Sequence, residues 1–383
     1  MVAGYVHVEV VQAQSPKRPE GPCGDLLACD RTAAATTLIC ADGVGSGVRA
    51  RIAAEMCVSR LRELLRLEFS LRKGMASLVH TMEHPRDPAR PFAAFSVARI
   101  LNDGMTTVLG YEAPPPVLVS RRHASLLAPS PIELGGGLVQ EYNCYLEPGD
   151  GLLLVSDGIT QAGLGTSVPD GWTAEGAVRF LNGRLVDGLA TRDLPDRLHR
   201  EALRLWAVAG DDCTAALALC RRGQIVNLLT GPPSDPSLDV ATVRRFMQSE
   251  GLKIVCGGTT AEIVARAIGV PLRVEQEPKS LVAPPRYEIT GVDLVTEGAV
   301  TLNQVYNLLD EDLRHVKEDS GVIELCMFLQ IADRVNVLVG GARNKANDDI
   351  AFRQRGILSR HQILPLLLEK LRAAEKLVVL QQV

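Results

Sequence analysis

Apolar and polar positions follow two different patterns along the chain. In the first 222 residues, short runs of β-branched and apolar residues are bounded by glycine, proline, aspartate and asparagine, which is typical of β-strands. These runs predict strands at residues 5–12, 36–41, 92–100, 106–110, 116–120, 151–156 and 214–220. Apolar residues three and four apart predict helices at residues 48–69 and 72–83, with two more near 174–181 and 194–208. Strands in series with helices grouped between them indicate an α+β sandwich.

After residue 222 the pattern becomes a regular alternation of apolar strand and helix. Strands are predicted at residues 225–229, 253–256, 293–295, 335–339 and 377–380. Helices are predicted between and after them, at residues 240–250, 260–267, 302–313, 323–332 and 361–375, and the proline-rich residues 277–286 are predicted to form a loop. Such alternation indicates a mostly parallel sheet with helices on its faces. We therefore expect an α+β domain at 1–222 and an α/β domain at 223–383.

Composition supports two globular domains and excludes several classes of protein. The 383 residues exceed what one hydrophobic core usually supports, and the 46% hydrophobic and 22% charged residues are typical of a folded globular chain. The net charge is −4 and no block of lysine or arginine is present, so no nucleic-acid partner is predicted. The start of the chain does not have the pattern of a signal peptide, and the apolar runs are too short to span a membrane. These features predict a cytoplasmic protein without a membrane segment.

The nine cysteines are predicted to be reduced. Several lie inside apolar runs, such as Cys40, Cys256 and Cys326, and no CxxC pair occurs. Buried thiols of this kind pack like small apolar residues.

Aspartates gather at the ends of the predicted strands of the first domain. Asp42 and Asp157 each follow an apolar strand, Asp211 and Asp212 directly precede one, and Asp25 precedes a less clear one. At strand ends, side chains can be held over a shared cleft. Carboxylates without histidine or cysteine among them suit hard cations such as Mg²⁺ or Mn²⁺, whereas Zn²⁺ would favour softer ligands.

Glycines accompany these aspartates in four short motifs. In DGVGSG, which begins at Asp42, the glycines permit a tight turn after the strand, so that Asp42 can bridge two ions while the Gly43 carbonyl faces one of them. Taken alone, the motif could equally be an ordinary Asp-Gly turn. The four motifs occur in the order GD (24–25), DGVGSG (42–47), SDGI (156–159) and GDDCT (210–214). As a set they resemble the SpoIIE branch of the type 2C (PPM) metal-dependent serine/threonine protein phosphatases, and the resemblance covers residues 1–222.

The resemblance implies a type 2C β-sandwich flanked by helices, with two Mn²⁺ or Mg²⁺ ions. Asp42 corresponds to the carboxylate that bridges both ions, Asp157 and Asp211 to ligands of the first ion, and Asp25 with the Gly43 carbonyl to ligands of the second. Asp42, Asp157 and Asp211 are therefore the expected catalytic residues. Two ions lower the pKa of a bridging water, which attacks the phosphorus in line, so no phosphoenzyme is expected.

The sequence departs from related enzymes at several positions. Val44 stands where eukaryotic type 2C enzymes have a histidine, so water or the substrate is expected to protonate the leaving group. No arginine aligns securely with their phosphate-holding arginine, and Arg18 is the nearest candidate. The use of Asp212 varies in the family and stays open. Ser156 lacks the GxSxG context of a serine nucleophile, so we expect it to position the neighbouring Asp157.

Two helical features of the first domain receive a structural interpretation. His80 and His84 are four residues apart on a predicted helix, but without a third ligand they are expected to mark a solvated helix end. The apolar stripe of residues 48–69 is expected to be core packing. In relatives the helices that follow the DG motif act as a switch that couples partner binding or dimerisation to the metal site, and this remains the alternative.

Four predicted strands of the second domain end in small or polar residues. Open parallel sheets bind ligands at the carboxyl ends of their strands, so these residues are expected to lie beside a binding site. Gly257, Gly258, Thr259 and Thr260 also lead into a helix whose N-terminal amides favour an anion, so they are candidates for binding a phosphate-containing ligand. Alternatively, the glycines only end the strand and a threonine caps the helix. Segments of this domain resemble a C-terminal extension of SpoIIE-family proteins.

Three functions remain open at this stage. The first is a phosphatase of bacterial signalling that acts on a phosphoprotein, such as an anti-sigma antagonist-like protein. The second is a weakly active phosphatase-fold scaffold or sensor whose α/β domain binds the ligand, and the third is a small-molecule phosphohydrolase. A homodimer is compatible with each of them.

Overall fold

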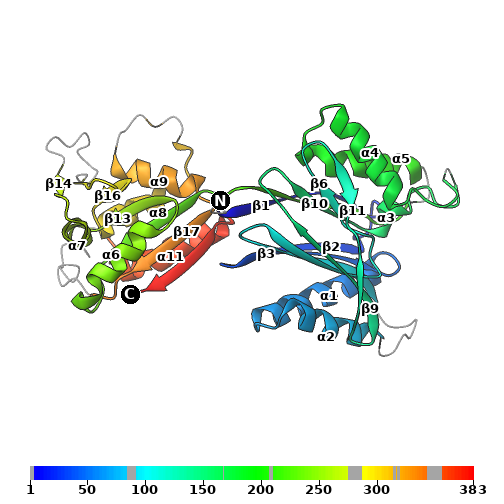
Figure 1. Ribbon diagram of the computed structural model, residues 1–383, viewed down its shortest axis with the longest axis horizontal. Helices are drawn as coiled ribbons and strands as arrows, with labels where there is room; N and C mark the ends of the chain where they lie inside the picture. The colour runs from blue at the N-terminus through cyan, green and yellow to red at the C-terminus, as the bar shows by residue number, and fades with distance from the viewer. Residues whose placement is uncertain are drawn as a thin grey trace. The chain divides into compact units, whose positions relative to one another are not determined.

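The chain divides into two compact units, Met1–Arg222 and Gly223–Val383, each with its own sheets and helices (Figure 1). The computed structural model describes residues 4–83, 92–166, 168–206, 210–274, 287–313, 316, 320–342 and 356–383. The predicted loop 277–286 and His84 lie outside these residues.

The first unit contains two antiparallel sheets. One has six strands in the order β2-β3-β4-β5-β9-β8, and the other has five in the order β1-β11-β10-β6-β7. The strands of the six-stranded sheet are β2 (Asp25–Arg31), β3 (Ala35–Gly43), β4 (Ala93–Leu101), β5 (Met105–Tyr111), β8 (Ser130–Leu134) and β9 (Gly137–Tyr145). Those of the five-stranded sheet are β1 (Val6–Ser15), β6 (Val117–Val119), β7 (Ala124–Leu126), β10 (Gly151–Val155) and β11 (Cys213–Arg222).

Helices cover the outer face of each sheet. The six-stranded sheet packs against α1 (Val48–Arg66) and α2 (Leu71–Glu83), and the five-stranded sheet packs against α4 (Ala174–Val186) and α5 (Leu194–Trp206) (Figure 1). A third core lies between the two sheets and includes Val8, Leu38 and Leu154. The expected sandwich is therefore confirmed, with an order of helix, sheet, sheet and helix. Among the described residues, no helix has the length and apolarity needed to cross a bilayer.

The second unit is built on one seven-stranded sheet in the order β14-β15-β16-β13-β12-β17-β18. Five neighbouring strands run parallel to one another, namely β16, β13, β12, β17 and β18. The strands β14 and β15 add an antiparallel edge beside β16. The strands are β12 (Ile225–Thr230), β13 (Leu252–Cys256), β14 (Arg273–Val274), β15 (Tyr287–Glu288), β16 (Leu294–Thr296), β17 (Arg334–Val339) and β18 (Leu377–Gln382). The expected mostly parallel sheet is confirmed.

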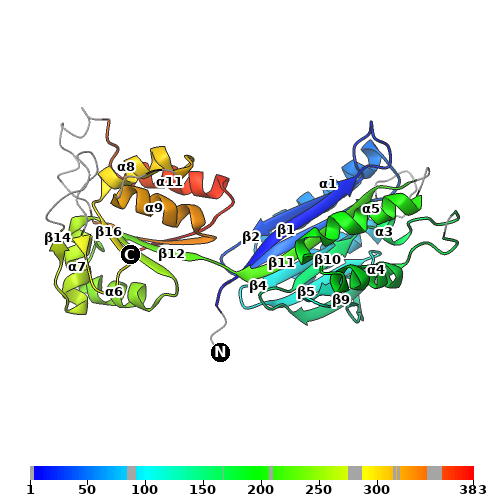
Figure 2. The ribbon, with the colours of Figure 1, turned by 90° about the horizontal axis from the view of Figure 1, so that it is seen from above.

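Helices cover both faces of this sheet, as Figure 2 shows. One face packs against α6 (Asp239–Gln248) and α7 (Gly258–Ile268), and the other against α8 (Ala299–Leu308), α9 (Gly321–Ile331) and α11 (Arg360–Ala373). The chain continues from β12 to its neighbour β13 on one side and from β17 to its neighbour β18 on the other, so the two connections run toward opposite edges of the sheet. The carboxyl ends of β12 and β17 thus form a switch point, where open parallel sheets bind ligands.

Most predicted elements occur within a few residues of their expected bounds, with two kinds of difference. The sequence analysis missed β7, β8, β9, β14 and β15, which are short or carry polar residues on one face. It also extended α8 to residue 313, whereas the helix ends at Leu308. Asp310, Glu311 and Asp312 follow, and acidic side chains are unfavourable at a helix C-terminus because the carbonyl end of the helix is already negative.

All nine cysteines are free thiols, and six of them are buried. The predicted burial of Cys40, Cys256 and Cys326 is therefore confirmed, and their reduced state stays a prediction. Burial raises the pKa of Cys57 and Cys326 to about 12, so these thiols are not nucleophiles near neutral pH.

Candidate functional site

Three of the predicted carboxylates meet at the ends of strands from both sheets of the first unit. Asp25 begins β2 and pairs in register with Asp42, near the end of β3. Asp157 begins the short helix α3 (Asp157–Thr160), which follows β10 of the other sheet. The charges of Asp25 and Asp157 both act on the Asp42 carboxyl group and raise its pKa. The sandwich therefore brings together acids that lie far apart in the sequence.

A chain of hydrogen bonds fixes the orientation of Asp25. Gln14 donates from Nε2 to the hydroxyl of Thr214 at 2.9 Å, and this hydroxyl donates to Oδ2 of Asp25 at 2.5 Å. Asp25 is fully buried, yet its Oδ1 has no hydrogen-bond partner. A buried carboxylate oxygen without a partner is costly, so its position favours a bound cation.

Burial raises the pKa values of all three carboxyl groups. The pKa of Asp25 rises to about 6, against the opposing effect of its hydrogen bond from Thr214. The pKa of Asp42 rises to about 10 through burial and through the charges of Asp25 and Asp157, and burial also raises the pKa of Asp157. These groups cannot all be charged at neutral pH unless a cation compensates them.

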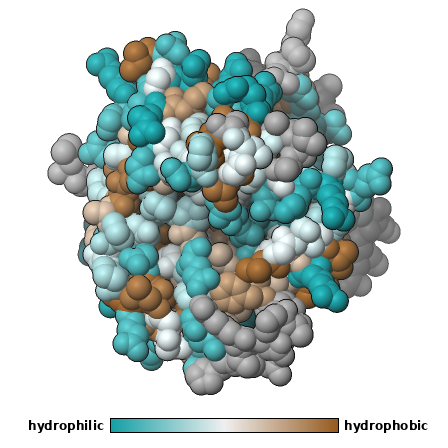
Figure 3. Space-filling model, turned by 90° about the vertical axis from the view of Figure 1, so that its right-hand side faces the viewer, coloured by the Kyte–Doolittle hydropathy of each residue, from teal (hydrophilic) through white to brown (hydrophobic). Residues whose placement is uncertain are grey.

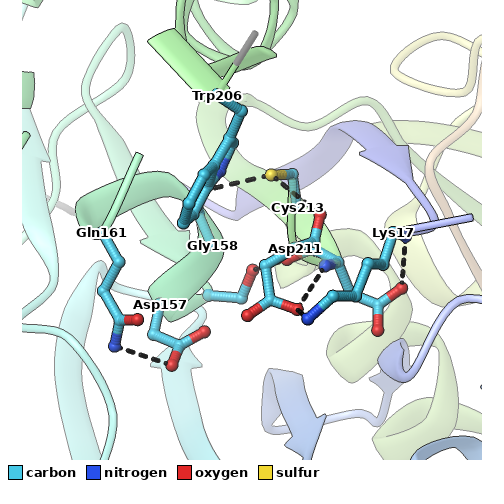
Figure 4. Close-up of polar contacts among 9 residues, drawn as sticks. Lys17, Asp157, Gly158, Gln161, Trp206, Asp211 and Cys213 are labelled. Atoms are coloured by element: carbon cyan, nitrogen blue, oxygen red, sulfur yellow. Dashed lines mark hydrogen bonds and ion pairs between the residues drawn. The ribbon is translucent and has the colours of Figure 1, made fainter. Parts of the chain in front are cut away.

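Asp211 and Asp212 are held by the loop that connects β1 and β2. Lys17 places its Nζ 3.2 Å from Oδ1 of Asp211, and its backbone N–H donates to Oδ1 of Asp212 at 2.8 Å. Figure 4 shows the carboxylates of Asp157 and Asp211 pointing to the same side of the site, with Lys17 beside Asp211. Asp212 thus anchors this loop, whereas Asp211 keeps a more exposed position beside a lysine.

The glycines of the motifs allow close contacts between the elements that carry the acids. A Cβ on Gly43 would lie 1.8 Å from the carbonyl oxygen of Ala50 in α1, and a Cβ on Gly158 would lie 2.0 Å from the carbonyl oxygen of Asp212. Gly45 and Gly47 have φ values of 105° and 71°, as expected for the turn after β3. Gly43 is therefore required for close packing, whereas the later glycines form the turn.

Two contacts hold α3 in place. Gln161 donates from Nε2 to Oδ2 of Asp157 at 2.9 Å, and Trp206 at the end of α5 donates from Nε1 to the carbonyl of Gly158 at 2.8 Å (Figure 4). Trp206 is therefore close enough to report on events at Asp157.

The chemistry of this cluster fits hard divalent cations. Its donors are carboxylate oxygens, one of which is buried and has no partner. However, no three His, Cys, Asp or Glu side chains of the described residues are arranged closely enough to enclose an ion. The charges of Asp25 and Asp157 raise the pKa of Asp42, so the three carboxyl groups act on one another. Asp25, Asp42 and Asp157 are thus suitable as ligands in type and burial.

Sequence reasoning about individual side chains was incomplete in this site. Among the described residues, the exposed Arg18 makes no hydrogen bond or ion pair to the acids, whereas the adjacent Lys17 contacts Asp211. A role of Arg18 in holding phosphate stays a prediction. Ser156 was expected to position Asp157, but its Oγ accepts from the backbone N–H of Thr214 at 2.9 Å and donates to the carbonyl of Asp212 at 3.5 Å. Ser156 therefore holds the segment from Asp212 to Thr214.

The helix α1 has both a buried and an exposed apolar face. Its buried residues pack on the six-stranded sheet, as the core interpretation expected. Val48, Ile52 and Met56, four residues apart, are 62%, 45% and 59% exposed. Figure 3 shows hydrophobic residues scattered among hydrophilic ones on the face of the molecule that it draws. A switch or dimer role for this face of α1 stays a prediction.

In the second unit, the predicted residues Gly257–Thr260 lie at the carboxyl end of β13 and the start of α7. Gly257 is the N-cap with φ 127°, and no side chain caps the helix, so the alternative of a threonine cap is wrong. Thr260 instead accepts from the backbone N–H of Gly231 at 3.0 Å. The carboxylate of Glu297 bonds the Tyr287 hydroxyl, which lies close to Gly258. An acid is therefore already present near this helix end.

A buried arginine lies at the switch point of the same sheet. Arg360 is 8% exposed, and its Nη2 donates to the carbonyls of Gly340 and Ala342 at 2.8 Å each. Its guanidinium lies against Gly231, where a Cβ would be 1.1 Å from Nη1. Among the described residues, no carboxylate pairs with it, and burial lowers its pKa. Sequence reasoning missed Arg360, because it comes from a helix far along the chain.

Comparison with known proteins relates the first unit to one family. Residues 32–222 match the family described as stage II sporulation protein E (SpoIIE). No curated protein matches the chain.

Solved structures with a similar fold share few identical residues with the chain. One is the PP2C phosphatase domain with a fragment of the regulatory domain of SpoIIE from Bacillus subtilis, with 18% identity and a TM-score of 0.47, covering 58% of this chain and 66% of that one. Another contains the RsbU and RsbW domains of a Mycobacterium tuberculosis protein, with 16% identity and a TM-score of 0.47, covering 63% and 69%. RsbX in complex with magnesium has 17% identity and a TM-score of 0.41, covering 56% and 99%. The chain thus spans just under two thirds of the SpoIIE structure.

Proposed function

Because residues 32–222 belong to the SpoIIE family of type 2C protein phosphatases, we propose that this chain hydrolyses phosphoserine or phosphothreonine in a phosphoprotein of bacterial signalling. The observation that carries the proposal is the cluster of Asp25, Asp42 and Asp157, in which a buried Asp25 oxygen has no partner. Burying like charges together lowers the stability of a fold, so a buried cluster of acids indicates a site that binds cations.

We assign the ligands of two Mn²⁺ or Mg²⁺ ions to five residues. Asp42 would contact both ions, Asp157 and Asp211 one of them, and Asp25 with the Gly43 carbonyl the other. Two such ions supply Lewis acidity, which lowers the pKa of a bound water and neutralises charge on the phosphoryl group. The effect of both the Asp25 and the Asp157 charge on Asp42 supports a position of Asp42 between the two ions.

The remaining residues of the site prepare these ligands for binding. Thr214 and Gln14 hold Asp25 with its free oxygen in a fixed direction, and Gln161 holds Asp157. Val44 is 59% exposed and has no proton to give, so a solvent water or the substrate itself protonates the leaving oxygen in this proposal. The turnover rate should then depend on the leaving group's own pKa.

The decisive experiment is Mn²⁺-dependent hydrolysis of an aryl phosphate by the full chain and by Asp42→Asn. We expect turnover that requires the metal and is lost in the variant. An absence of metal-dependent turnover by the natural chain would favour the scaffold. Turnover of the aryl phosphate without action on phosphoserine peptides or a phosphorylated anti-sigma antagonist-like protein would instead favour a small-molecule phosphohydrolase.

A second function, ligand binding by the α/β unit, is favoured by Arg360. Within the described part of the chain, this buried guanidinium bonds carbonyl oxygens and no carboxylate, and an anion would balance its charge. We therefore move the proposed phosphate contact from Gly257–Thr260 toward the ends of β12 and β17. Thermal unfolding of the full chain with pyrophosphate or ATP tests this idea. We expect stabilisation that Arg360→Gln abolishes, and equal stabilisation of the variant would contradict the assignment.

A further inference from the structure

A groove on the outer face of the first unit lies between α4 and α5. Its volume is about 600 Å³, and its lining includes four arginines, namely Arg184 from α4 and Arg197, Arg200 and Arg204 from α5. On α5 these arginines are three and four residues apart, so they lie on one side of the helix. The opposite side packs Leu198 and Ala202 into the core. The amphipathic helix thus directs its positive charges into the groove.

The groove carries an excess of positive charge. Four arginines line it against two acids, Asp187 and Glu201. Arg184 pairs with Asp187, Arg204 with Glu201, and Arg200 with Asp196, which lies outside the lining, whereas Arg197 has no ion pair among the described residues. The side chains of the paired arginines are 48%, 69% and 65% exposed. Exposed ion pairs of this kind contribute only about 0.2–1 kcal/mol, so an arriving carboxylate can exchange with them.

The lining of the groove also contains apolar surface. Phe180 and Leu189 contribute to it, and the guanidinium of Arg184 lies 5.2 Å from the centre of the Phe180 ring. A site of this composition fits a peptide segment with acidic side chains and some apolar ones, because guanidinium groups bind carboxylates through paired hydrogen bonds. A nucleic acid fits less well, since the two lining acids would face its phosphates and the whole chain carries a net charge of −4.

The two helices of the groove are connected to the aspartate cluster. The Phe180 ring packs edge-on against Trp172 at 5.5 Å, and Thr173 donates its backbone N–H to the carbonyl of Thr160, the last residue of α3. At the end of α5, Trp206 bonds Gly158 in the same short helix. A segment bound in the groove therefore rests on the elements that position Asp157.

We propose that the groove between α4 and α5 binds an acidic segment of the phosphoprotein substrate, apart from the phosphoryl group itself. This inference rests on the proposed phosphatase function and adds a substrate class to it. The aspartate cluster would act on the phosphate, while Arg197 and Arg200 select substrates with nearby acidic residues. Charge-based recognition of this type is expected to weaken as salt increases.

The test compares the full chain with the charge-reversal variant Arg197→Glu/Arg200→Glu. Arg179→Glu is the matched control, because Arg179 is an exposed residue of α4 outside the groove lining. Three substrates are used with each protein. They are an aryl phosphate, a phosphoserine peptide flanked on both sides by aspartates, and the same peptide with asparagine at each aspartate.

We expect the natural chain to prefer the aspartate peptide, with a preference that falls as salt is raised. The double variant should raise the KM for that peptide by about 10-fold or more, which corresponds to about 1.4 kcal/mol, and leave kcat unchanged. It should hydrolyse the aryl phosphate and the asparagine peptide normally, as should the control. An unchanged KM for the aspartate peptide in the double variant would overturn the proposal.

A binding measurement separates this proposal from the phosphatase function. Fluorescence anisotropy of the labelled aspartate peptide with the full chain needs no turnover, so it remains informative if no hydrolysis is found. We expect binding that the double variant loses and the control retains. Binding that a single-stranded oligonucleotide displaces as well as the peptide does, or that survives in the double variant, would contradict an acidic peptide as the occupant.

Discussion

Asp25 and Asp42 lie directly opposite each other across the β2–β3 ladder, so two acids share one pair position. Like charges at such a position destabilise a sheet. Asp25 is nevertheless fully buried and Asp42 half-buried, and the charge of Asp25 contributes to the raised pKa of Asp42. Residue pairs that lower the stability of a fold in this way usually lie at functional sites, where they serve binding. The pair therefore leads to predictions for both stability and metal binding.

Asp42→Asn should separate these two effects. The folded chain must take up a proton to bury the Asp42 carboxyl at neutral pH, whereas the amide needs none, so the metal-free variant should unfold at a temperature a few degrees higher than the natural chain. At the same time, Mn²⁺ binding should be lost and turnover should fall by more than about 100-fold, since even changes behind a metal ligand cost about 10–100-fold. Calorimetry without metal and a Mn²⁺ titration provide the measurements. A variant that is less stable and still binds Mn²⁺ would refute the assignment of Asp42.

Stability of the metal-free protein should fall as the pH rises. The unfolded chain releases these protons near pH 4, whereas the folded chain holds them until about pH 6 at Asp25 and about pH 10 at Asp42. Between these values the folded state binds more protons than the unfolded state, so each increase in pH favours unfolding. Unfolding temperatures measured from about pH 5 to pH 9 should therefore decrease, apart from contributions of other groups.

Added Mn²⁺ should reverse this trend. The cation replaces the protons, so its binding should tighten with rising pH and release protons into the buffer. Calorimetric titration in two buffers of different ionisation enthalpy measures that release. A binding heat that is the same in both buffers would contradict the raised pKa values.

Lys17→Met should strengthen metal binding. The ammonium of Lys17 lies 3.2 Å from Asp211, and a cation that binds Asp211 must compete with it. Because the lysine side chain is 40% exposed, the pair is worth about 0.2–1 kcal/mol, so we expect Mn²⁺ to bind up to about fivefold more tightly. Lys17→Arg is the control that keeps the charge. The fluorescence of Trp206 reports the titration, and weaker binding by Lys17→Met would show that the lysine assists the metal.

Gly43→Ala should destabilise the first unit. Its Cβ would lie 1.8 Å from a backbone oxygen of α1, which cannot move without separating the helix from β3. A loss of about 1–3 kcal/mol is expected from such overpacking, with weaker Mn²⁺ binding as a result. Gly183→Ala is the matched control, because a Cβ at this position in α4 meets nothing within 4 Å and should stabilise the helix by about 0.5–1 kcal/mol. Denaturant unfolding of both variants measures the difference, and equal stability would contradict the close-packing role of Gly43.

Several parts of the site could be predicted from the sequence because they depend on local chemistry. The position of Asp42 after an apolar strand and the turn formed by Gly45 and Gly47 follow from residue types and short spacings. Contacts between distant segments could not be predicted in this way. Thr214 and Lys17 reach the acids from β11 and from the loop after β1, and nothing in their immediate neighbours specifies these partners.

The sequence by itself determined the two fold classes and nearly all long elements, because hydrophobic periodicity and strand-ending residues act over a few neighbouring positions. It also determined the type of metal chemistry, since carboxylates alone select hard cations. Only the tertiary structure decided which oxygen of Asp25 is left without a partner, that Arg360 is buried at the switch point, and that arginines from α4 and α5 line one groove. The physical reason is that the burial and pairing of a side chain depend on elements that folding brings together. The spacing of residues along the chain does not specify which of these elements meet.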